Sequence, residues 1–118
     1  MSIKITKADK HGLFSIYQII ETFRDLDHDA PMQMVSVFLV IAMRPGVYQR
    51  DLIGFVGISQ PAVSRHVMAL GERNRHGEPG LGLILQRRDP FDARQITLHL
   101  TPAGKALVER LLSIGQSQ

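Results

Sequence analysis

Residues 48–70 read YQRDLIGFVGISQPAVSRHVMAL, a pattern that predicts a short helix, a tight turn and a second helix. Leu52, Phe55 and Val56 repeat at three-to-four spacing, so we expect them to share the inward face of the first helix. The pattern stops at Gly57, and a glycine can take the positive φ that commonly ends a helix. The first helix is therefore expected to end at this turn.

The second helix has its own start signal and its own apolar face. Ser59 can cap it, and Pro61 falls in its first turn, where backbone N–H groups have no intrahelical partner. Val63, Val67 and Leu70 recur at helical spacing within about 60° of arc, which predicts a buried stripe. The whole stretch is therefore typical of a helix-turn-helix.

The opposite face of the second helix is polar and carries mostly short side chains. A helix that enters the DNA major groove, which is about 12 Å wide, needs small residues near its N-terminus and Gln or Arg to read base edges. The alternative is a helical hairpin in an ordinary α-helical core, with a solvated polar face. His66, at the side of the helix, is either a phosphate donor or a residue at the edge of the core. The pattern predicts DNA contacts by Ser59, Gln60, Pro61, Ser64, Arg65 and Met68.

The length of 118 residues suits one domain with one core. We expect residues 1–12 to form a polar N-terminal tail and residues 13–118 to form a single domain with flanking N- and C-terminal helices. The longest apolar run, residues 35–43, is far shorter than the roughly 20 residues that a membrane span needs. We therefore expect no membrane partner and a cytoplasmic location. Without cysteine the chain has no disulfide and no thiolate zinc site.

Positive charge is concentrated in the part of the chain that contains the helix pair. Residues 44–105 contain nine Lys or Arg and five Asp or Glu, whereas residues 1–43 contain four and five. A basic half favours nucleic acid as a partner, because phosphate neutralisation releases counterions. A solvated surface is the alternative.

Two helices are predicted before the helix-turn-helix. Residues 32–43 are apolar nearly all round, which predicts the central core helix, and Pro31 precedes them. The acidic turn at 25–29 lacks the glycine and the distal glutamate of a calcium loop, so we expect no metal there. Residues 13–26 have a broad apolar arc, which indicates either a fully buried helix or a dimer interface. This arc comprises Leu13, Ile16, Ile20 and Phe23, widened by Tyr17 and Ile19.

A hairpin is predicted after the helix pair and a loop at residues 75–80. Residues 81–86 and 95–100 are the two strand candidates, and the second alternates apolar and polar side chains. The connection between them, residues 87–94, contains an exposed aromatic, Phe91, and three arginines. A hairpin placed after a recognition helix is typical of a wing that brings arginine to phosphates or into the minor groove. The predicted wing contacts to DNA are Arg87, Arg88 and Arg94.

A closing helix is predicted after the hairpin. Thr101 can cap it and Pro102 can occupy its first position. Its apolar face is expected to comprise Ala106, Leu107, Leu111 and Ile114. The predicted fold is mainly α with a small β-hairpin, a winged helix-turn-helix of the α+β class.

Residues 32–112 resemble the MarR (multiple-antibiotic-resistance regulator) family of winged-helix transcription regulators. One stretch that carries the resemblance is 49–67, where DL, GIS and AVSRHV stand as the family's helix pair. The other is Asp92-Ala93-Arg94, followed by Leu100-Thr101 and Gly104, which is similar to the family's Asp-x-Arg wing tip and its Leu-Thr-x-x-Gly start of the closing helix. The sequence departs from the family at Tyr48, where Ser or Thr is usual.

The resemblance implies roles for individual residues. Gln60, Ser64 and Arg65 would contact DNA in the major groove, and Arg94 would reach the minor groove. Asp92 would hold Arg94 in place through a charge-assisted hydrogen bond, which lowers the entropy lost on binding.

The sequence therefore predicts a sequence-specific regulator, a repressor, that binds double-stranded DNA as a homodimer formed through its N- and C-terminal helices. The alternatives are a replication or maintenance factor of a plasmid or phage, and a winged helix used as a protein-interaction module. We expect no enzyme, no catalytic residues, no metal and no cofactor, because the histidines and carboxylates lack the spacing of a catalytic or metal site. No feature of the sequence indicates a small-molecule ligand.

Overall fold

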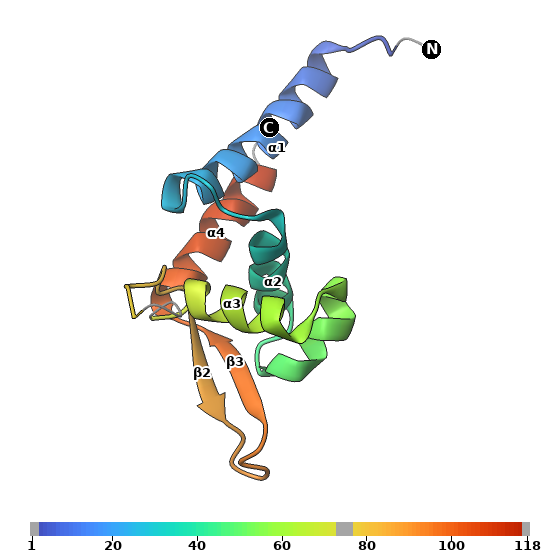
Figure 1. Ribbon diagram of the computed structural model, residues 1–118. Helices are drawn as coiled ribbons and strands as arrows, with labels where there is room; N and C mark the ends of the chain where they lie inside the picture. Colours follow the sequence, from blue (N-terminus) through green and yellow to red (C-terminus); the bar gives the residue numbers. More distant parts are fainter. Residues whose placement is uncertain (1–2, 73–76, 117–118) are drawn as a thin grey trace.

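The computed structural model describes residues 3–72 and 77–116. Helices and a small sheet build the fold, and the hairpin projects from the helical body (Figure 1). The predicted class, a mainly α winged helix-turn-helix, is confirmed. The elements in order are α1 (Lys7–Leu26), α2 (Met32–Met43), β1 (Val47–Tyr48), the 3₁₀ turn η1 (Gln49–Asp51), the π turn η2 (Ile53–Gly57), α3 (Gln60–Leu70), β2 (Ile84–Arg88), β3 (Ile96–Leu100) and α4 (Pro102–Gln116).

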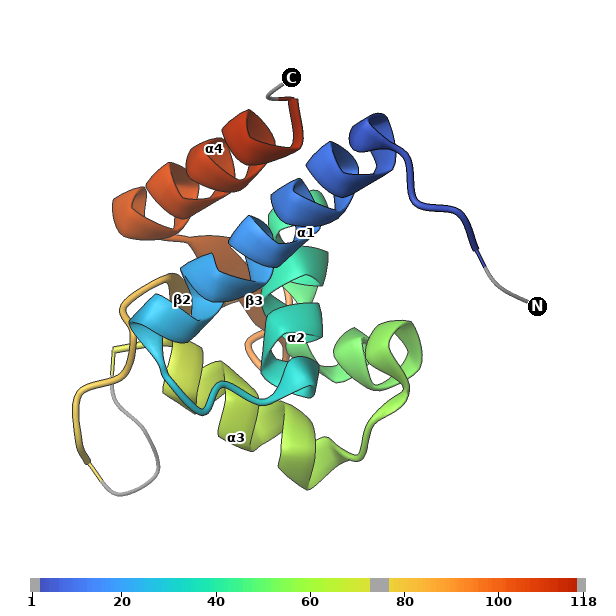
Figure 2. The same ribbon diagram turned by 90° about the horizontal axis from the view of Figure 1, so that it is seen from above.

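The core surrounds α2, which has the bounds that the sequence predicts. Phe38 and Ile41 of this helix are fully buried, together with Leu52 of the helix pair and Leu98 of β3. Seen from above, α1 and α4 lie side by side on one side of α2, and α3 lies on the other (Figure 2). The predicted central position of α2 is confirmed, and its apolar circumference follows from packing on both sides.

Helix α1 begins six residues earlier than the sequence interpretation placed it. The Thr6 hydroxyl accepts a hydrogen bond from the Asp9 N–H, and the Asp9 carboxylate accepts one from the Thr6 N–H, which forms a capping box. The assignment of residues 7–12 to a tail was therefore wrong, since this start signal outweighs the cost of Gly12 in a helix. No helix in the described residues is long and apolar enough to cross a membrane.

The first helix of the predicted pair is a 3₁₀ turn followed by a π turn. Leu52 is buried as predicted, whereas Phe55 is 47% exposed, with the Arg44 guanidinium 4.2 Å from the centre of its ring. The inward placement of Phe55 was wrong because a π turn has more residues per turn than an α-helix, so three-to-four spacing does not keep one face. Gly57 has a φ of +74°, as its predicted role at the turn requires.

The three-stranded sheet has the order β1-β3-β2, with antiparallel pairing throughout. Strand β2 begins at Ile84 and extends to Arg88, three residues later than predicted at its start. The reason lies in the backbone of residues 81–83, because the N–H groups of Leu81 and Leu83 donate to carbonyls at the end of α3. The sequence interpretation missed β1, which has only two residues. Of the predicted loop at 75–80, residues 75–76 lie outside the described residues.

The start of α4 is locked onto the segment that precedes β2. The Thr101 hydroxyl donates to the Gly82 carbonyl at 2.6 Å and accepts from the Gly104 N–H at 3.0 Å, so its predicted capping role is confirmed. A Cβ at Gly104 would lie 2.1 Å from the Leu83 carbonyl oxygen. The prediction that Ala106 belongs to the apolar face was wrong, because this residue is exposed.

Candidate nucleic-acid interface

Helix α3 has the capping and packing that the sequence predicts. The Ser59 hydroxyl accepts a hydrogen bond from the Ala62 N–H at 3.3 Å. Val63, Val67 and Leu70 are each at most 2% exposed, which fixes the rotation of the helix about its axis. The polar face is consequently turned away from the core.

The predicted contact residues of α3 all lie outside the core. Ser59, Gln60, Pro61 and Arg65 are exposed, whereas Ser64 and Met68 are half-buried.

His66 points inward from the same helix. It is 8% exposed, and its Nε2 lies 3.2 Å from Oε1 of Gln33. Burial lowers the pKa of this imidazole. The interpretation of His66 as a core-edge residue is therefore confirmed, and it does not belong to the polar face.

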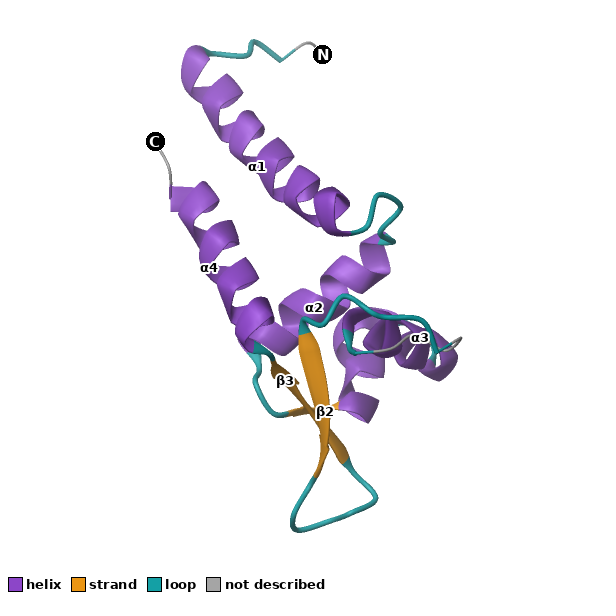
Figure 3. Ribbon diagram, turned by 90° about the vertical axis from the view of Figure 1, so that its left-hand side faces the viewer, coloured by secondary structure: helices purple, strands orange, loops and turns teal. Residues whose placement is uncertain are grey.

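The hairpin of β2 and β3 extends well beyond the helical body (Figure 3). A network of hydrogen bonds closes its tip. The Asp89 N–H donates to the Gln95 carbonyl at 3.0 Å, and the Tyr48 hydroxyl donates to the Asp89 carboxylate at 2.5 Å. The latter bond lowers the pKa of Asp89 and raises the pKa of Tyr48. Tyr48, where the sequence departs from the MarR pattern, thus ties β1 to the base of the tip.

Asp92 holds Arg94 as the sequence interpretation suggested. Its Oδ1 accepts from both the backbone N–H and the Nε of Arg94, each at 3.1 Å, and its Oδ2 lies 3.4 Å from Nη2. These hydrogen bonds lower the pKa of Asp92. Since the Arg94 side chain is 89% exposed, the pair orders the guanidinium without removing it from solvent.

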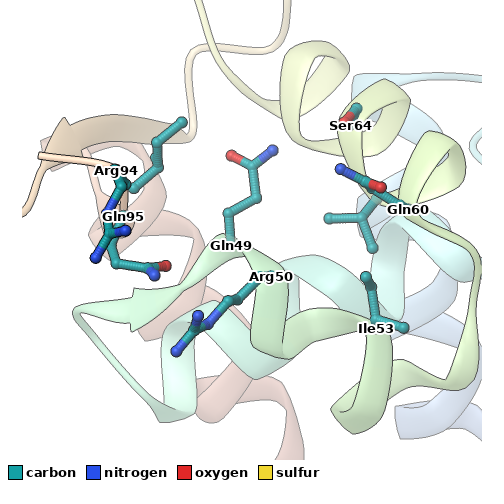
Figure 4. A pocket seen from close by; sticks show the side chains of 9 residues that line it. Gln49, Arg50, Ile53, Gln60, Ser64, Arg94 and Gln95 are labelled. Carbon is teal, nitrogen blue, oxygen red and sulfur yellow. The ribbon is translucent and has the colours of Figure 1, made fainter.

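A hollow of about 320 Å³ joins α3 to the wing (Figure 4). Gln60 and Ser64 of α3 face it from one side, and Arg94 of the wing lies at the other. The structure therefore brings together three of the residues that the resemblance singles out. The complete lining is Gln49, Arg50, Ile53, Gln60, Val63, Ser64, Arg94, Gln95 and Ile96.

Gln49, Arg50 and Gln95 belong to this hollow but were not among the predicted contacts. Gln49 is held in place, because its Oε1 accepts from Nε2 of Gln86 at 2.7 Å. No local signal in the sequence marks these residues, because their place at the hollow depends on how the helix pair and the wing are arranged around α3.

The remaining predicted wing residues divide between two faces of the hairpin. Arg88 pairs with Ile96, and directly opposite residues of neighbouring strands share a face, so Arg88 lies on the side of the hollow. Its Nη1 donates to the Ala93 carbonyl at 2.8 Å. Arg87 pairs with Thr97 and lies on the opposite face. Arg65 and Met68 do not line the hollow. All the DNA contacts named from the sequence, on α3 and on the wing, stay predictions.

A capped recognition helix, a three-stranded sheet and a projecting hairpin that shares a hollow with the helix define a winged helix-turn-helix protein. No protein-family model matches the sequence, and no curated protein matches it. Solved structures do match, which confirms the resemblance to the MarR family at the level of the fold.

A structure of MarR is 25% identical, with a TM-score of 0.60 over 87% of this chain and 72% of the other. A complex of S. aureus MepR with DNA is 21% identical, with a TM-score of 0.65 over 92% of this chain and 82% of the other. The transcriptional repressor CouR, bound to a 23-mer DNA duplex, is 23% identical, with a TM-score of 0.61 over 97% of this chain and 79% of the other. The solved structures that share this fold with the chain thus include transcriptional regulators.

Proposed function

We propose that this protein is a sequence-specific transcription regulator, a repressor, that binds double-stranded DNA. Helix α3 reads base edges in the major groove, and the wing contacts phosphates or the minor groove. The observation that carries the proposal is the shared hollow, because it sets Gln60 and Ser64 of α3 and Arg94 of the wing around one space. A cytoplasmic location follows from this function.

The solved neighbours support the proposal independently of the hollow. MepR and CouR were each solved on DNA with the fold that this chain adopts. The exposed guanidiniums of Arg50 and Arg94 provide positive charge on the side where a duplex would lie. A phosphate backbone is the natural counterpart of such a surface.

Titration of the protein with duplex DNA at several salt concentrations tests the proposal. We expect the logarithm of the association constant to fall linearly with the logarithm of salt concentration, by roughly 0.9 for each phosphate neutralised. A duplex selected from a random library should bind more tightly than a random duplex. A flat salt dependence would support the protein-interaction alternative, and a selected site at a replication origin would support the replication alternative.

We also propose that the regulator is a homodimer formed through α1 and α4. Apolar side chains on these helices remain uncovered, and Phe14 stacks on Tyr17 with 6.2 Å between ring centres. Four of the six residues of the α1 arc predicted from the sequence are therefore exposed, although Phe23 is buried. The exposed large apolar residues are Leu13, Phe14, Ile16, Tyr17, Ile20 and Leu26 of α1 and Leu112 of α4.

Sedimentation of an Ile16→Asp variant tests the dimer. We expect the wild type to sediment at twice the mass of the chain, and the variant to sediment as a monomer, because a buried, unpaired carboxylate opposes association. Met43→Asp is the matched control, since Met43 is 73% exposed and lies on α2. A monomeric wild type, or a dimer that Ile16→Asp leaves intact, would contradict this interface.

A further inference from the structure

Phe91, at the tip of the wing, is 96% exposed and is the most exposed large hydrophobic side chain in the described residues. The ring contributes no hydrophobic stabilisation to the fold, because no other described part of the chain covers it. A ring that is held out into solvent suggests a contact with something other than this chain.

The turn that carries Phe91 is fixed rather than loose. The Phe91 N–H donates to Oδ1 of Asp89 at 2.8 Å, while Oδ2 of the same carboxylate accepts from the Tyr48 hydroxyl. Pro90 lies between Asp89 and Phe91 in the sequence, and its ring fixes its φ. The Gln95 N–H closes the other side of the turn by donating to the Asp92 carbonyl at 2.9 Å. Ordering this backbone therefore costs little when a ligand binds.

The surroundings of the ring suit DNA in spite of two nearby carboxylates. Asp89 is 9% exposed and accepts hydrogen bonds from Tyr48 and Phe91, and Asp92 is engaged by Arg94. At the tip the Arg94 side chain is the more exposed partner of its ion pair, at 89% against 35% for Asp92. An exposed apolar ring and an exposed guanidinium on the same turn match the minor groove, whose negative potential attracts arginine and into which apolar side chains insert.

We propose that Phe91 enters the minor groove beside Arg94 and makes the wing selective for A·T base pairs. This inference rests on the proposed function and names a specificity-determining residue for it. The minor-groove edge of G·C differs from that of A·T by the N2 amino donor of guanine. A phenyl ring covers this donor without accepting a hydrogen bond, and an unsatisfied buried donor weakens binding.

Replacing single base pairs in the flanks of the selected duplex tests this selectivity. Each flanking position is made A·T, G·C or inosine·C, because inosine lacks the N2 amino group but keeps the major-groove edge of guanine. At the position under the wing we expect wild type to bind A·T and inosine·C equally and G·C about tenfold more weakly. Phe91→Ala should bind all three alike, whereas Phe91→Leu should keep part of the preference.

Two further variants distinguish the effect of the Phe91 ring from that of the hydrogen bonds that hold its turn. Tyr48→Phe removes only the hydroxyl that holds Asp89, so we expect a weaker A·T preference with little loss of affinity. Phe55→Ala, which removes a half-exposed ring that does not line the hollow, should leave the preference unchanged. The thermal midpoint of each variant is also measured, and only variants whose midpoint equals that of the wild type are compared, which excludes loss of folding.

The outcomes distinguish this inference from the function on which it rests. In one outcome, the wild type binds DNA with a steep salt dependence but binds inosine·C no more tightly than G·C at any flanking position. In that case the inference fails and the proposed function stands. The same holds if Phe91→Ala keeps the preference of the wild type for A·T. If wild type binds no duplex, both fail.

Discussion

Gly104→Ala is expected to lower the free energy of unfolding by about 3 kcal/mol, because no space exists for a side chain at this position. The added Cβ would lie 2.1 Å from the carbonyl oxygen of Leu83 and 3.2 Å from Cδ2 of Leu100. The carbonyl belongs to a backbone that cannot move away cheaply, since its oxygen also accepts the Thr101 N–H at 3.0 Å. Urea denaturation at a fixed protein concentration measures the loss as a lower midpoint with an unchanged slope.

Gly115→Ala in the same helix is the control for the intrinsic effect of the substitution. No atom lies within 4 Å of a Cβ at Gly115, so we expect stability to be unchanged or to rise by up to about 1 kcal/mol. Equal effects at the two glycines would show that Gly104 of α4 lies farther from the Leu83 carbonyl in solution than in the structure. The Gly of the Leu-Thr-x-x-Gly pattern is thus explained by packing of α4 against the start of the wing, not by a contact with DNA.

The sequence predicted the elements whose signals are local. The bounds of α2 and the cap of α3 depend on residues within one turn, such as Pro31 and Ser59, and these signals act the same way in any context. Thr6 and Asp9 carry an equally local signal for the start of α1, which the interpretation overlooked. The π turn could not be predicted from the sequence, because the apolar spacing of residues 52–56 fits an α-helix equally well.

The candidate site was predicted where its parts are neighbours in the sequence. Asp92 and Arg94 lie two residues apart, so their pairing could be inferred from the turn between them. The contribution of Gln49 and Gln95 could not, since it depends on how the wing and the helix pair are placed around α3. Strand β1 was missed for the same reason, because Val47 and Tyr48 become a strand only by pairing with β3.

Arg65→Ala and Arg94→Ala are expected to weaken DNA binding in different ways. Arg65 is exposed on α3, and no other side chain in the part of the chain that the structure describes forms an ion pair with it. If it reads a guanine or another base edge, its loss should cost about 1–3 kcal/mol on the selected duplex and relax the preference at one position. Binding to a random duplex should change much less.

Arg94→Ala should instead weaken selected and random duplexes to a similar degree and should reduce the salt slope by about 1, because its expected partners are phosphates or the minor groove. Competition titrations with both duplexes measure the two losses. Arg44→Ala is the matched control, since Arg44 packs on Phe55, lies outside α1 and α4 and does not line the hollow, and this variant should bind both duplexes as wild type does. A loss for Arg65→Ala that is equal on both duplexes would mean that Arg65 contacts the backbone. The specificity of α3 would then depend on Gln60 and Ser64, the two predicted readers that line the hollow.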